Sequence, residues 1–373
     1  MIILKYAEFG KTGCKVSRLG FGAMRLPLTD PDDSASIDVD EAIKMLRFAI
    51  DSGVNYIDTA FFYHNEESEK VVGKALKDGY REKTYLATKL PVGEVKKTAD
   101  FDRILNTQLE KLGTDHINFY LFHALNEKHW ETVKRLELVD KMKKAKADGK
   151  IRHIGFSFHD NPEIFTKIVD EYDGCEFCQI QLNYLDVDHQ AGVDGLEYAA
   201  SKGLGVVIME PIRGGRLANP SEEIVSALPT GKTPVENALS FLWDKSEVSL
   251  LLSGMSSFEQ VKQNLASADK FGIDCLTEDE RRRFAEAKKI FDMSTLVPCT
   301  GCEYCQPCPN DVLIPKVFAA YNKIGEGNLR SVRAAMPDIE DVIGRCVKCG
   351  LCEEKCPQQI KIIEELRSIN RRF

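Results

Sequence analysis

Apolar and amphipathic segments alternate along the chain from residue 19 to about residue 270. Each apolar segment has the length of a β-strand, is rich in β-branched or aromatic residues, and contains few polar positions. Such nearly continuous apolar runs are typical of strands buried on both faces. The eight segments are LGFGAM (19–24), NYIDTA (55–60), TYLATKL (84–90), INFYLFHA (117–124), HIGFSF (153–158), FCQIQLNY (177–184), GVVIMEP (205–211) and SLLLSGM (249–255).

The segments between these strands predict amphipathic helices. Residues 41–53 and 103–113 have apolar side chains at intervals of three and four positions, and each segment closes with a glycine. Residues 235–245 follow Pro234, and proline suits the first position of a helix. Residues 256–268 begin with a serine that can cap the helix.

Eight successive strand–helix units favour an α/β fold, a (β/α)8 TIM barrel. A doubly wound open sheet is the alternative, but such sheets seldom contain so many evenly spaced units. The first 18 residues, with a KTG turn at residues 11–13, predict a short hairpin before the first strand. We expect this hairpin to close the bottom of the barrel, and we place the barrel domain at residues 1–290.

Titratable residues end three consecutive predicted strands: Asp58, Lys89 and His123, with Tyr63 five residues after Asp58. Barrel enzymes carry their chemistry at the carboxyl ends of the strands, and adjacent strands lie about 5 Å apart. Each residue alone has a structural alternative, such as a salt bridge at a strand end or packing of the tyrosine. The ordered set on consecutive strands favours one catalytic site.

This set of residues suits carbonyl reduction. A hydride that reaches a carbonyl carbon leaves charge on the oxygen, which then needs a proton donor. Tyr63 can donate that proton, since a Lys89 ammonium nearby makes a phenol more acidic and Asp58 can hold the ammonium in place. His123 can orient the carbonyl oxygen.

Four stretches resemble the aldo-keto reductase family: FGKTGCKVSRLGFGAMRLP (9–27), NYIDTAFFYHNEESE (55–69), YLATKL (85–90) and LFHAL (121–125). The resemblance covers residues 5 to about 270. It implies the barrel fold and maps the family's catalytic tetrad onto Asp58, Tyr63, Lys89 and His123.

The resemblance also implies a nicotinamide cofactor, NAD(P)H, across the later strand ends. Ser157 and Gln179 match the residues that bind the carboxamide. Phe158 stands where the family has an asparagine, and Met209 stands where an aromatic residue usually stacks on the nicotinamide.

Two later segments are candidates for binding the cofactor's phosphates and adenosine. The first, RGGRL, contributes Arg213, Gly214, Gly215 and Leu217. The second begins a helix, where phosphates bind readily, and it matches the family's adenosine-binding residues at Gly254, Ser256, Gln260, Gln263 and Asn264. An ordinary loop and helix cap is the alternative. Gly254 and Gln260 stand where basic residues commonly bind a 2′-phosphate, so the choice between NAD and NADP stays open.

Twelve cysteines occur in the chain, and eight of them form two runs after residue 298. The second run, followed by Pro357, is C-x2-C-x2-C-x3-C-P, the bacterial ferredoxin spacing. The first run, followed by Pro309, differs only in its last spacing. Zinc is the alternative, but a zinc site needs only four thiolates, so two 4Fe-4S clusters are favoured. The runs are Cys299, Cys302, Cys305, Cys308 and Cys346, Cys349, Cys352, Cys356.

In two-cluster ferredoxins the fourth cysteine of each run binds the other cluster. This rule pairs Cys356 with the first three cysteines of the first run, and Cys308 with the first three of the second. Residues 317–325 and 328–336 between the runs look helical, so residues 291–373 predict a mostly helical ferredoxin-like domain. Cys175 and Cys178 have no second pair and are interpreted as structural, while Cys14 and Cys275 indicate nothing.

Composition narrows the class of protein. Hydrophobic residues make up 43% and charged residues 29% of the chain, which is typical of a globular protein. The net charge of −8 argues against a general nucleic-acid binder. Lys5 and Glu8 interrupt the amino terminus, and no segment approaches the roughly 20 apolar residues that cross a bilayer. We therefore expect a cytoplasmic protein with no membrane contact.

Together these features predict an oxidoreductase that reduces or oxidises a small-molecule carbonyl or alcohol, coupled to electron transfer through the two clusters and to a redox partner protein. Nicotinamides carry two electrons as hydride, whereas 4Fe-4S clusters carry one. FMN in the same barrel is therefore an alternative. A further alternative is an inactive barrel with an electron-carrier or docking role. The loop at residues 25–38 should contact the substrate, but its sequence does not specify a ligand.

Overall fold

The computed structural model describes residues 3–31, 33–294, 296–322 and 329–372. The chain divides into two compact units. The first contains Met1–Pro211 and Ala238–Thr277, and the second contains Ile212–Asn237 and Glu278–Phe373. The domain boundary expected between residues 290 and 291 stays a prediction.

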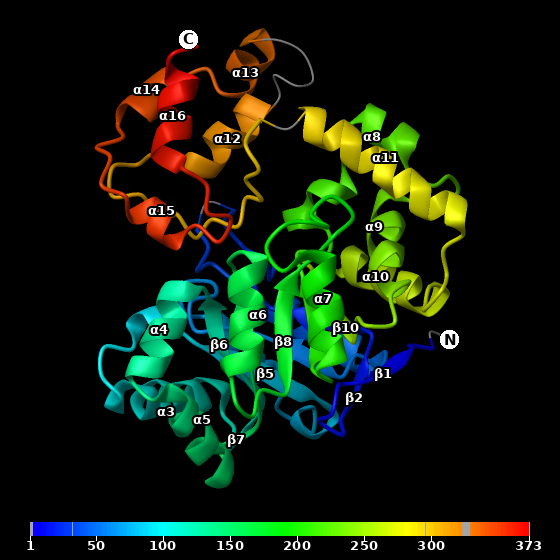
Figure 1. Cartoon of the computed structure of the whole chain (residues 1–373), viewed down its shortest axis with the longest axis vertical. Coiled ribbons are helices and arrows are strands. Elements are labelled where there is room, and N and C mark those ends of the chain that lie inside the picture. Colours follow the sequence, from blue (N-terminus) through cyan, green and yellow to red (C-terminus); the bar gives the residue numbers. More distant parts are fainter. Residues whose placement is uncertain (1–2, 32, 295, 323–328, 373) are drawn as a thin grey trace. The chain divides into compact units, whose positions relative to one another are not determined.

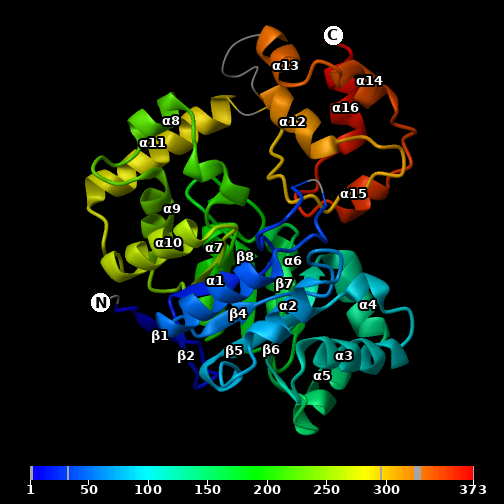
Figure 2. The same ribbon diagram turned by 180° about the vertical axis from the view of Figure 1, so that it is seen from behind.

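Eight parallel strands close into a barrel in the first unit (Figures 1 and 2). Each strand pairs with the strands before and after it along the chain, and the last pairs with the first. The barrel expectation is confirmed, and the open-sheet alternative is wrong. The strands are β3 (Leu19–Gly22), β4 (Tyr56–Asp58), β5 (Tyr85–Leu90), β6 (Ile117–Leu125), β7 (Ile151–Phe158), β8 (Phe177–Gln181), β9 (Gly205–Met209) and β10 (Leu250–Gly254).

Helices follow the barrel strands and surround them (Figures 1 and 2). Asp38 caps the first helix by accepting a hydrogen bond from the backbone N–H of Glu41, and Gly113 ends the third in the left-handed region, at φ 62°. They are α1 (Val39–Asp51), α2 (Ser68–Ala75), α3 (Ala99–Leu112), α4 (Glu127–Arg135), α5 (Leu138–Ala147), α6 (Pro162–Glu171), α7 (Gly192–Ser201), α9 (Pro234–Trp243) and α10 (Phe258–Lys270), with short turns η1 (Arg81–Lys83) and η2 (Val92–Glu94).

An amino-terminal hairpin precedes the barrel. Its strands, β1 (Tyr6–Glu8) and β2 (Lys15–Ser17), pair antiparallel. Phe9 is fully buried, and its ring centroid lies 5.9, 4.9 and 5.3 Å from those of Tyr56, Phe119 and Phe177. Tyr56 and Phe177 are the first residues of their strands, so the hairpin closes the amino-terminal end of the barrel. A side chain on Gly205 would collide with Phe9, because its Cβ would lie 2.3 Å from the ring.

The second unit is helical over its described residues. It contains η3 (Arg213–Ala218), α8 (Glu222–Ala227) and α11 (Glu278–Ser294) before the cysteine region. The helices of the cysteine region are α12 (Ile314–Asn322), α13 (Leu329–Ala335), α14 (Ile339–Gly344), α15 (Leu351–Lys355) and α16 (Ile362–Asn370). Its apolar core includes Val317, Phe318, Val342 and Leu366. The expected helices at 317–325 and 328–336 correspond to α12 and α13, while residues 323–328 lie outside the described residues.

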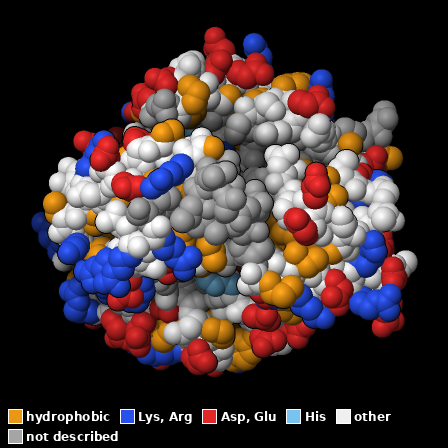
Figure 3. All heavy atoms as spheres, turned by 90° about the horizontal axis from the view of Figure 1, so that it is seen from above, with side chains coloured by type: hydrophobic (Ala, Val, Ile, Leu, Met, Phe, Trp, Pro, Cys, Tyr) orange, Lys and Arg blue, Asp and Glu red, His pale blue; other side chains and the backbone are white. Residues whose placement is uncertain are grey.

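The surface that Figure 3 shows carries acidic and basic side chains interspersed with apolar and uncharged ones. The electrostatic potentials of neighbouring acidic and basic side chains partly cancel, and salt screens what remains. Among the described residues, no helix has both the length and the apolar character needed to cross a membrane.

Candidate active site and cysteine sites

Lys89 lies at the centre of the residues predicted to form the catalytic tetrad. Its ammonium donates hydrogen bonds to Asp58 Oδ1 (2.6 Å), to the backbone oxygen of Thr59 (2.8 Å) and to the phenol oxygen of Tyr63 (3.2 Å). Strands β4 and β5 are neighbours, which brings Asp58 and Lys89 together, and the turn after β4 returns Tyr63 to the same place. All three side chains are buried.

His123, on β6, lies beside Tyr63. Their ring centroids are 6.1 Å apart and the rings are nearly perpendicular, at 83°. Burial lowers the pKa of His123 well below its usual value, and the positive charge of Lys89 lowers it further. The imidazole is therefore neutral near pH 7 and keeps one N–H that can donate to an oxygen.

Asp58 and Lys89 form a buried ion pair. Burial raises the pKa of Asp58, and the charge and hydrogen bond of Lys89 oppose that rise. Burial lowers the pKa of Lys89, and Asp58 opposes the decrease. Within the described part of the chain Asp58 Oδ2 has no hydrogen-bond partner. The ionised form of Asp58 is consequently stabilised mainly by the Lys89 ammonium, and the ionised form of Lys89 mainly by the Asp58 carboxylate.

A buried polar network behind the tetrad was not predicted. Glu69 Oε1 accepts hydrogen bonds from Thr88 Oγ1 (2.7 Å) and Gln108 Nε2 (2.8 Å), and Tyr120 donates to Gln108 Oε1 (2.6 Å). Gln108 also donates to the backbone oxygen of Lys89 (2.9 Å). One sequence feature indicates this network: Gln108 occupies a position of the buried face of α3 where helical spacing calls for an apolar residue.

The residues expected around the nicotinamide lie on neighbouring strands. Ser157 on β7 pairs in register with Gln179 on β8. Gln179 Nε2 lies 3.6 Å from Met209 Sδ, and in the described structure the buried Gln179 Oε1 has no partner. Ser157 Oγ accepts a hydrogen bond from the backbone N–H of Ala124 (2.8 Å) and keeps a proton to donate. One acceptor and one donor thus remain for a carboxamide group.

Of the residues expected to bind adenosine, three surround the start of α10. Ser256 donates its N–H to Gln260 Oε1 (2.7 Å), and its hydroxyl donates to the backbone oxygen of Arg25 (2.9 Å). A Cβ on Gly254 would lie 3.3 Å from the Arg25 side chain.

The other two residues of that set make contacts within the barrel unit. Asn264 is buried and donates to Ser253 Oγ (2.9 Å). Gln263 donates to Glu259 Oε1 (3.1 Å) one turn earlier on the same helix. The structure therefore brings Gly254, Ser256 and Gln260 together and directs Asn264 inward.

The RGGRL segment forms η3 and belongs to the second unit. Gly214 and Gly215 have positive φ values of 63° and 94°, which favours glycine. Arg213 is buried, and its guanidinium lies 4.6 Å from the centre of the Phe291 ring. Leu217 is also buried. Packing on Phe291 fixes Arg213 within this unit.

The eight carboxy-terminal cysteines line two cavities of the second unit. One cavity is lined by Cys299, Cys302, Cys305 and Cys356, among other residues. The other is lined by Cys308, Cys346, Cys349 and Cys352, again with Cys305. Each cavity thus combines cysteines that are far apart in the sequence.

The chemistry of these thiols suits multinuclear metal binding. All eight are free of disulfides. Burial raises the pKa of Cys305, and the neighbouring Cys302, Cys299 and Cys356 raise it further, so a thiolate here needs a compensating positive charge. Among the described residues, no three His, Cys, Asp or Glu side chains converge as for a single ion. Four thiols around a cavity match the ligand set of a 4Fe-4S cluster.

Comparisons with known proteins agree with both parts of the chain. The sequence profile of the "Aldo/keto reductase family" matches residues 18–230, and that of a "4Fe-4S dicluster domain" matches residues 298–361. L-galactose dehydrogenase from Arabidopsis thaliana is 29% identical over 316 residues, which cover 78% of this chain and 97% of that protein.

Two solved structures are similar to the barrel. A holo aldo-keto reductase from Bacillus halodurans is 25% identical and superposes with a TM-score of 0.64. The alignment covers 76% of this chain and 96% of the other. An aldo/keto reductase from Klebsiella pneumoniae, in complex with NADP and acetate, is 26% identical, with a TM-score of 0.62 and coverage of 76% and 95%.

Proposed function

The chain belongs to the aldo/keto reductase family and carries a 4Fe-4S domain, and we propose that its barrel interconverts a small carbonyl compound and the matching alcohol with Tyr63 as the general acid or base. The observation that carries this proposal is the hydrogen bond from Lys89 to the Tyr63 oxygen within the buried site. The protein is an oxidoreductase that acts on a small molecule, and NADP-bound relatives support a nicotinamide cofactor.

The chain's own residues donate and accept the proton of the reaction. In the reductive direction Tyr63 gives its proton to the oxygen that gains charge, and Lys89 stabilises the negative charge left on the phenol oxygen. Asp58 holds the ammonium in place through the 2.6 Å contact. Neutral His123 donates an N–H to the same substrate oxygen and orients it. Burial of all four side chains keeps bulk water away from these transfers.

A nicotinamide supplies or accepts the hydride when it is bound. The free acceptor of Gln179 and the free donor of Ser157 fit its carboxamide, and Met209 lies beside Gln179. We assign Gly254, Ser256 and Gln260 to its adenosine end, because they surround the amino terminus of a 13-residue helix. Gln263, Asn264 and the η3 residues remain predicted contacts with the cofactor.

We assign two 4Fe-4S clusters to the second unit. Clusters of this kind pass single electrons, and cysteine thiolates are their usual ligands. The two cysteine-lined cavities support the count, and their composition supports crossing of Cys308 and Cys356 between the runs.

FMN in place of a nicotinamide remains the alternative cofactor. Its support is chemical, since a flavin exchanges both hydride and single electrons. Anaerobic purification followed by analysis of the released cofactor separates the two proposals. If the released cofactor shows flavin absorbance, FMN takes the place of the nicotinamide in the proposal. If the protein contains no flavin and turns over with NAD(P)H, the FMN alternative is rejected.

The Tyr63→Phe variant tests the proton transfer. It keeps the ring but removes the hydroxyl, so kcat for carbonyl reduction should fall by about 100- to 10,000-fold. Steady-state kinetics with NAD(P)H should use a panel of short aldehydes and aldoses. Aldoses are included because the plant relative is an L-galactose dehydrogenase.

A matched control is Tyr80→Phe, since Tyr80 lies on the surface and bonds Asp51. Its turnover should equal that of the wild type, and NAD(P)H should bind both variants equally. Unchanged turnover of Tyr63→Phe would reject the acid–base role. Absence of turnover in the wild type across the panel would favour the inactive barrel.

A further inference from the structure

A second cluster of reactive side chains lies in the barrel unit, away from the tetrad. Cys14 Sγ is 3.4 Å from His153 Nε2, and His153 Nδ1 is 2.8 Å from Glu176 Oε1. A nucleophile, a base and a carboxylate that orients the base are thus in series. This is the arrangement by which proteins activate a cysteine or serine.

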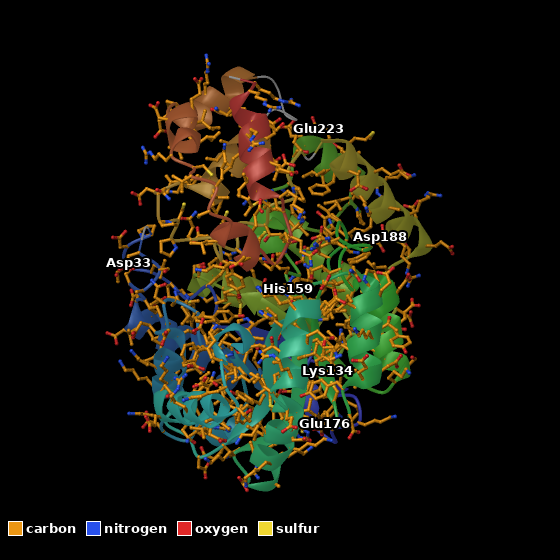
Figure 4. The ribbon with its side chains drawn as sticks, turned by 60° about the vertical axis from the view of Figure 1, so that its left-hand side comes forward. Asp33, Lys134, His159, Glu176, Asp188 and Glu223 are labelled. Carbon is orange, nitrogen blue, oxygen red and sulfur yellow. The ribbon has the colours of Figure 1, made fainter. Side chains whose placement is uncertain are left out.

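Three separate elements position this cluster. Cys14 lies in the amino-terminal hairpin, where its backbone oxygen accepts from Phe9 N–H at 2.9 Å. His153 lies on β7, with its ring stacked on Phe119 at 5.0 Å between centroids. Glu176 directly precedes β8, so it lies at the amino-terminal end of the barrel, opposite to His159, which follows β7 (Figure 4).

The partners of Glu176 determine the tautomer of His153. Burial raises the pKa of Glu176, but hydrogen bonds from His153, Lys146 and the N–H of Ile154 outweigh it and lower the pKa overall. Lys146 Nζ lies 2.6 Å from Glu176 Oε2. An ionised carboxylate only accepts, so Nδ1 of His153 carries the proton and Nε2 presents its lone pair to the thiol.

We propose that Cys14 is a nucleophilic thiol, which forms a thiolate–imidazolium pair with His153 and is the site where hydroperoxides oxidise the barrel. Small reagents can reach it, because Cys14 is half-buried and the His153 and Glu176 side chains are 17% and 21% exposed. Tyr85 lies against the same thiol and forms a hydrogen bond with it.

The reaction balances without a further reagent. The thiolate attacks one oxygen of the hydroperoxide, an S–O bond forms and the O–O bond breaks. Sulfur is oxidised by two electrons to the sulfenic acid, and the hydroperoxide is reduced to water or an alcohol. The leaving oxygen takes its proton from the His153 imidazolium, which returns to the neutral form.

The other barrel cysteines lack this arrangement. Burial raises the pKa of both Cys175 and Cys178, which suppresses their thiolates. Cys275 is half-buried like Cys14, but its thiol contacts the backbone oxygen of Ser240 at 3.7 Å. The Arg18 guanidinium also interacts with Cys275, so Cys275 is an internal reference for a half-buried thiol beside a positive charge.

Alkylation of the cluster-loaded protein tests the proposal. The full chain is treated anaerobically with limiting iodoacetamide at about pH 7, and each cysteine peptide is quantified by mass spectrometry. Cys14 should react at least about tenfold faster than Cys275. One equivalent of hydrogen peroxide with dimedone should then label the Cys14 peptide as a sulfenic acid.

Two variants separate activation from folding. His153→Gln should slow alkylation of Cys14 by about tenfold or more and leave Cys275 unchanged. Glu176→Gln should slow it less, because the amide oxygen still accepts from Nδ1.

Three results would overturn the proposal. They are equal rates at Cys14 and Cys275, a Cys14 rate that His153→Gln leaves unchanged, and fast alkylation with no dimedone label. Near-wild-type tryptophan fluorescence of each variant shows that the barrel is intact. If His153→Gln fails to fold, the smaller slowing in Glu176→Gln and the wild-type ratio to Cys275 still decide.

Discussion

All three protons of the Lys89 ammonium are donated to acceptors of the site: Asp58, the backbone oxygen of Thr59 and Tyr63. Two of these acceptors have roles in the proposed chemistry, and the third fixes the direction of the lysine. Lys89 thus balances the charge of Asp58, is held in a fixed direction and takes part in the proposed proton transfer. Any substitution of Lys89 should change stability and activity together.

The Lys89→Met variant should lose about 3–5 kcal/mol of unfolding free energy, because it leaves Asp58 buried without its counter-charge. Adding Asp58→Asn should restore much of that stability, while turnover stays lost. Urea unfolding and steady-state kinetics of the wild type, both single variants and the double variant measure the two effects. Equal instability of Lys89→Met and the double variant would contradict the ion-pair argument.

His123 should make the stability of the barrel dependent on pH. Its folded-state pKa is lowered by burial, so below about pH 6.5 the unfolded chain takes up a proton that the folded chain does not. This part of the stability is present above that pH and is lost as the pH falls, by about 1.4 kcal/mol per pH unit.

Tryptophan fluorescence can follow this loss, since Trp130 and Trp243 both belong to the first unit. Denaturant unfolding between about pH 7.5 and 5 should show a steeper decrease for the wild type than for His123→Asn. Parallel profiles for the two proteins would exclude this role of His123.

At the scale of elements, helix α3 contacts the surroundings of the site through one polar residue, Gln108. Gln108 satisfies Glu69, Tyr120 and the Lys89 backbone oxygen, although it occupies the apolar face of the helix. Buried polar groups of this kind cost free energy when they lose their partner.

The Gln108→Leu variant should therefore be destabilised by at least about 2 kcal/mol, even though leucine suits a buried helix face. Denaturant unfolding measures the change, and Glu110→Leu on the exposed face of α3 is the control. A Gln108→Leu variant as stable as the wild type would show that the network does not support the barrel.

The sequence pattern and the structure agree best where the physical cause is local. Each barrel strand was predictable because burial on both faces removes polar residues from a short continuous run. The grouping of Asp58, Lys89 and His123 was predictable because each lies near the end of such a run, and Tyr63 follows Asp58 by five residues. The sequence does not distinguish Glu69 from Glu66 and Glu67, since only packing of α2 against the barrel buries Glu69. The Cys14 cluster joins residues 139 and 162 positions apart, so no local spacing indicates it.

At the scale of the whole molecule, the two chemistries belong to different units. The predicted tetrad and the proposed nicotinamide contacts Ser157, Gln179 and Met209 lie in the first unit. The eight cysteines proposed as cluster ligands lie in the second unit, together with the η3 residues predicted to contact the cofactor. The residues proposed for proton transfer and those proposed for cluster binding thus belong to separate cores. Removal of cluster ligands should therefore change iron content without unfolding the barrel.

Paired cysteine substitutions test how the two clusters are ligated. With crossed ligation, Cys308 and Cys346 bind the same cluster, so Cys308→Ser with Cys346→Ser should lose one cluster and keep about four of about eight irons per chain. Cys308→Ser with Cys299→Ser should lose both clusters, because these cysteines then bind different ones. Iron and sulfide analysis of anaerobically purified protein gives the counts, and Cys275→Ser should keep the full content.

If Cys308→Ser with Cys299→Ser keeps more iron than Cys308→Ser with Cys346→Ser, each run holds its own cluster. A wild type with about one metal ion per four cysteines would favour zinc.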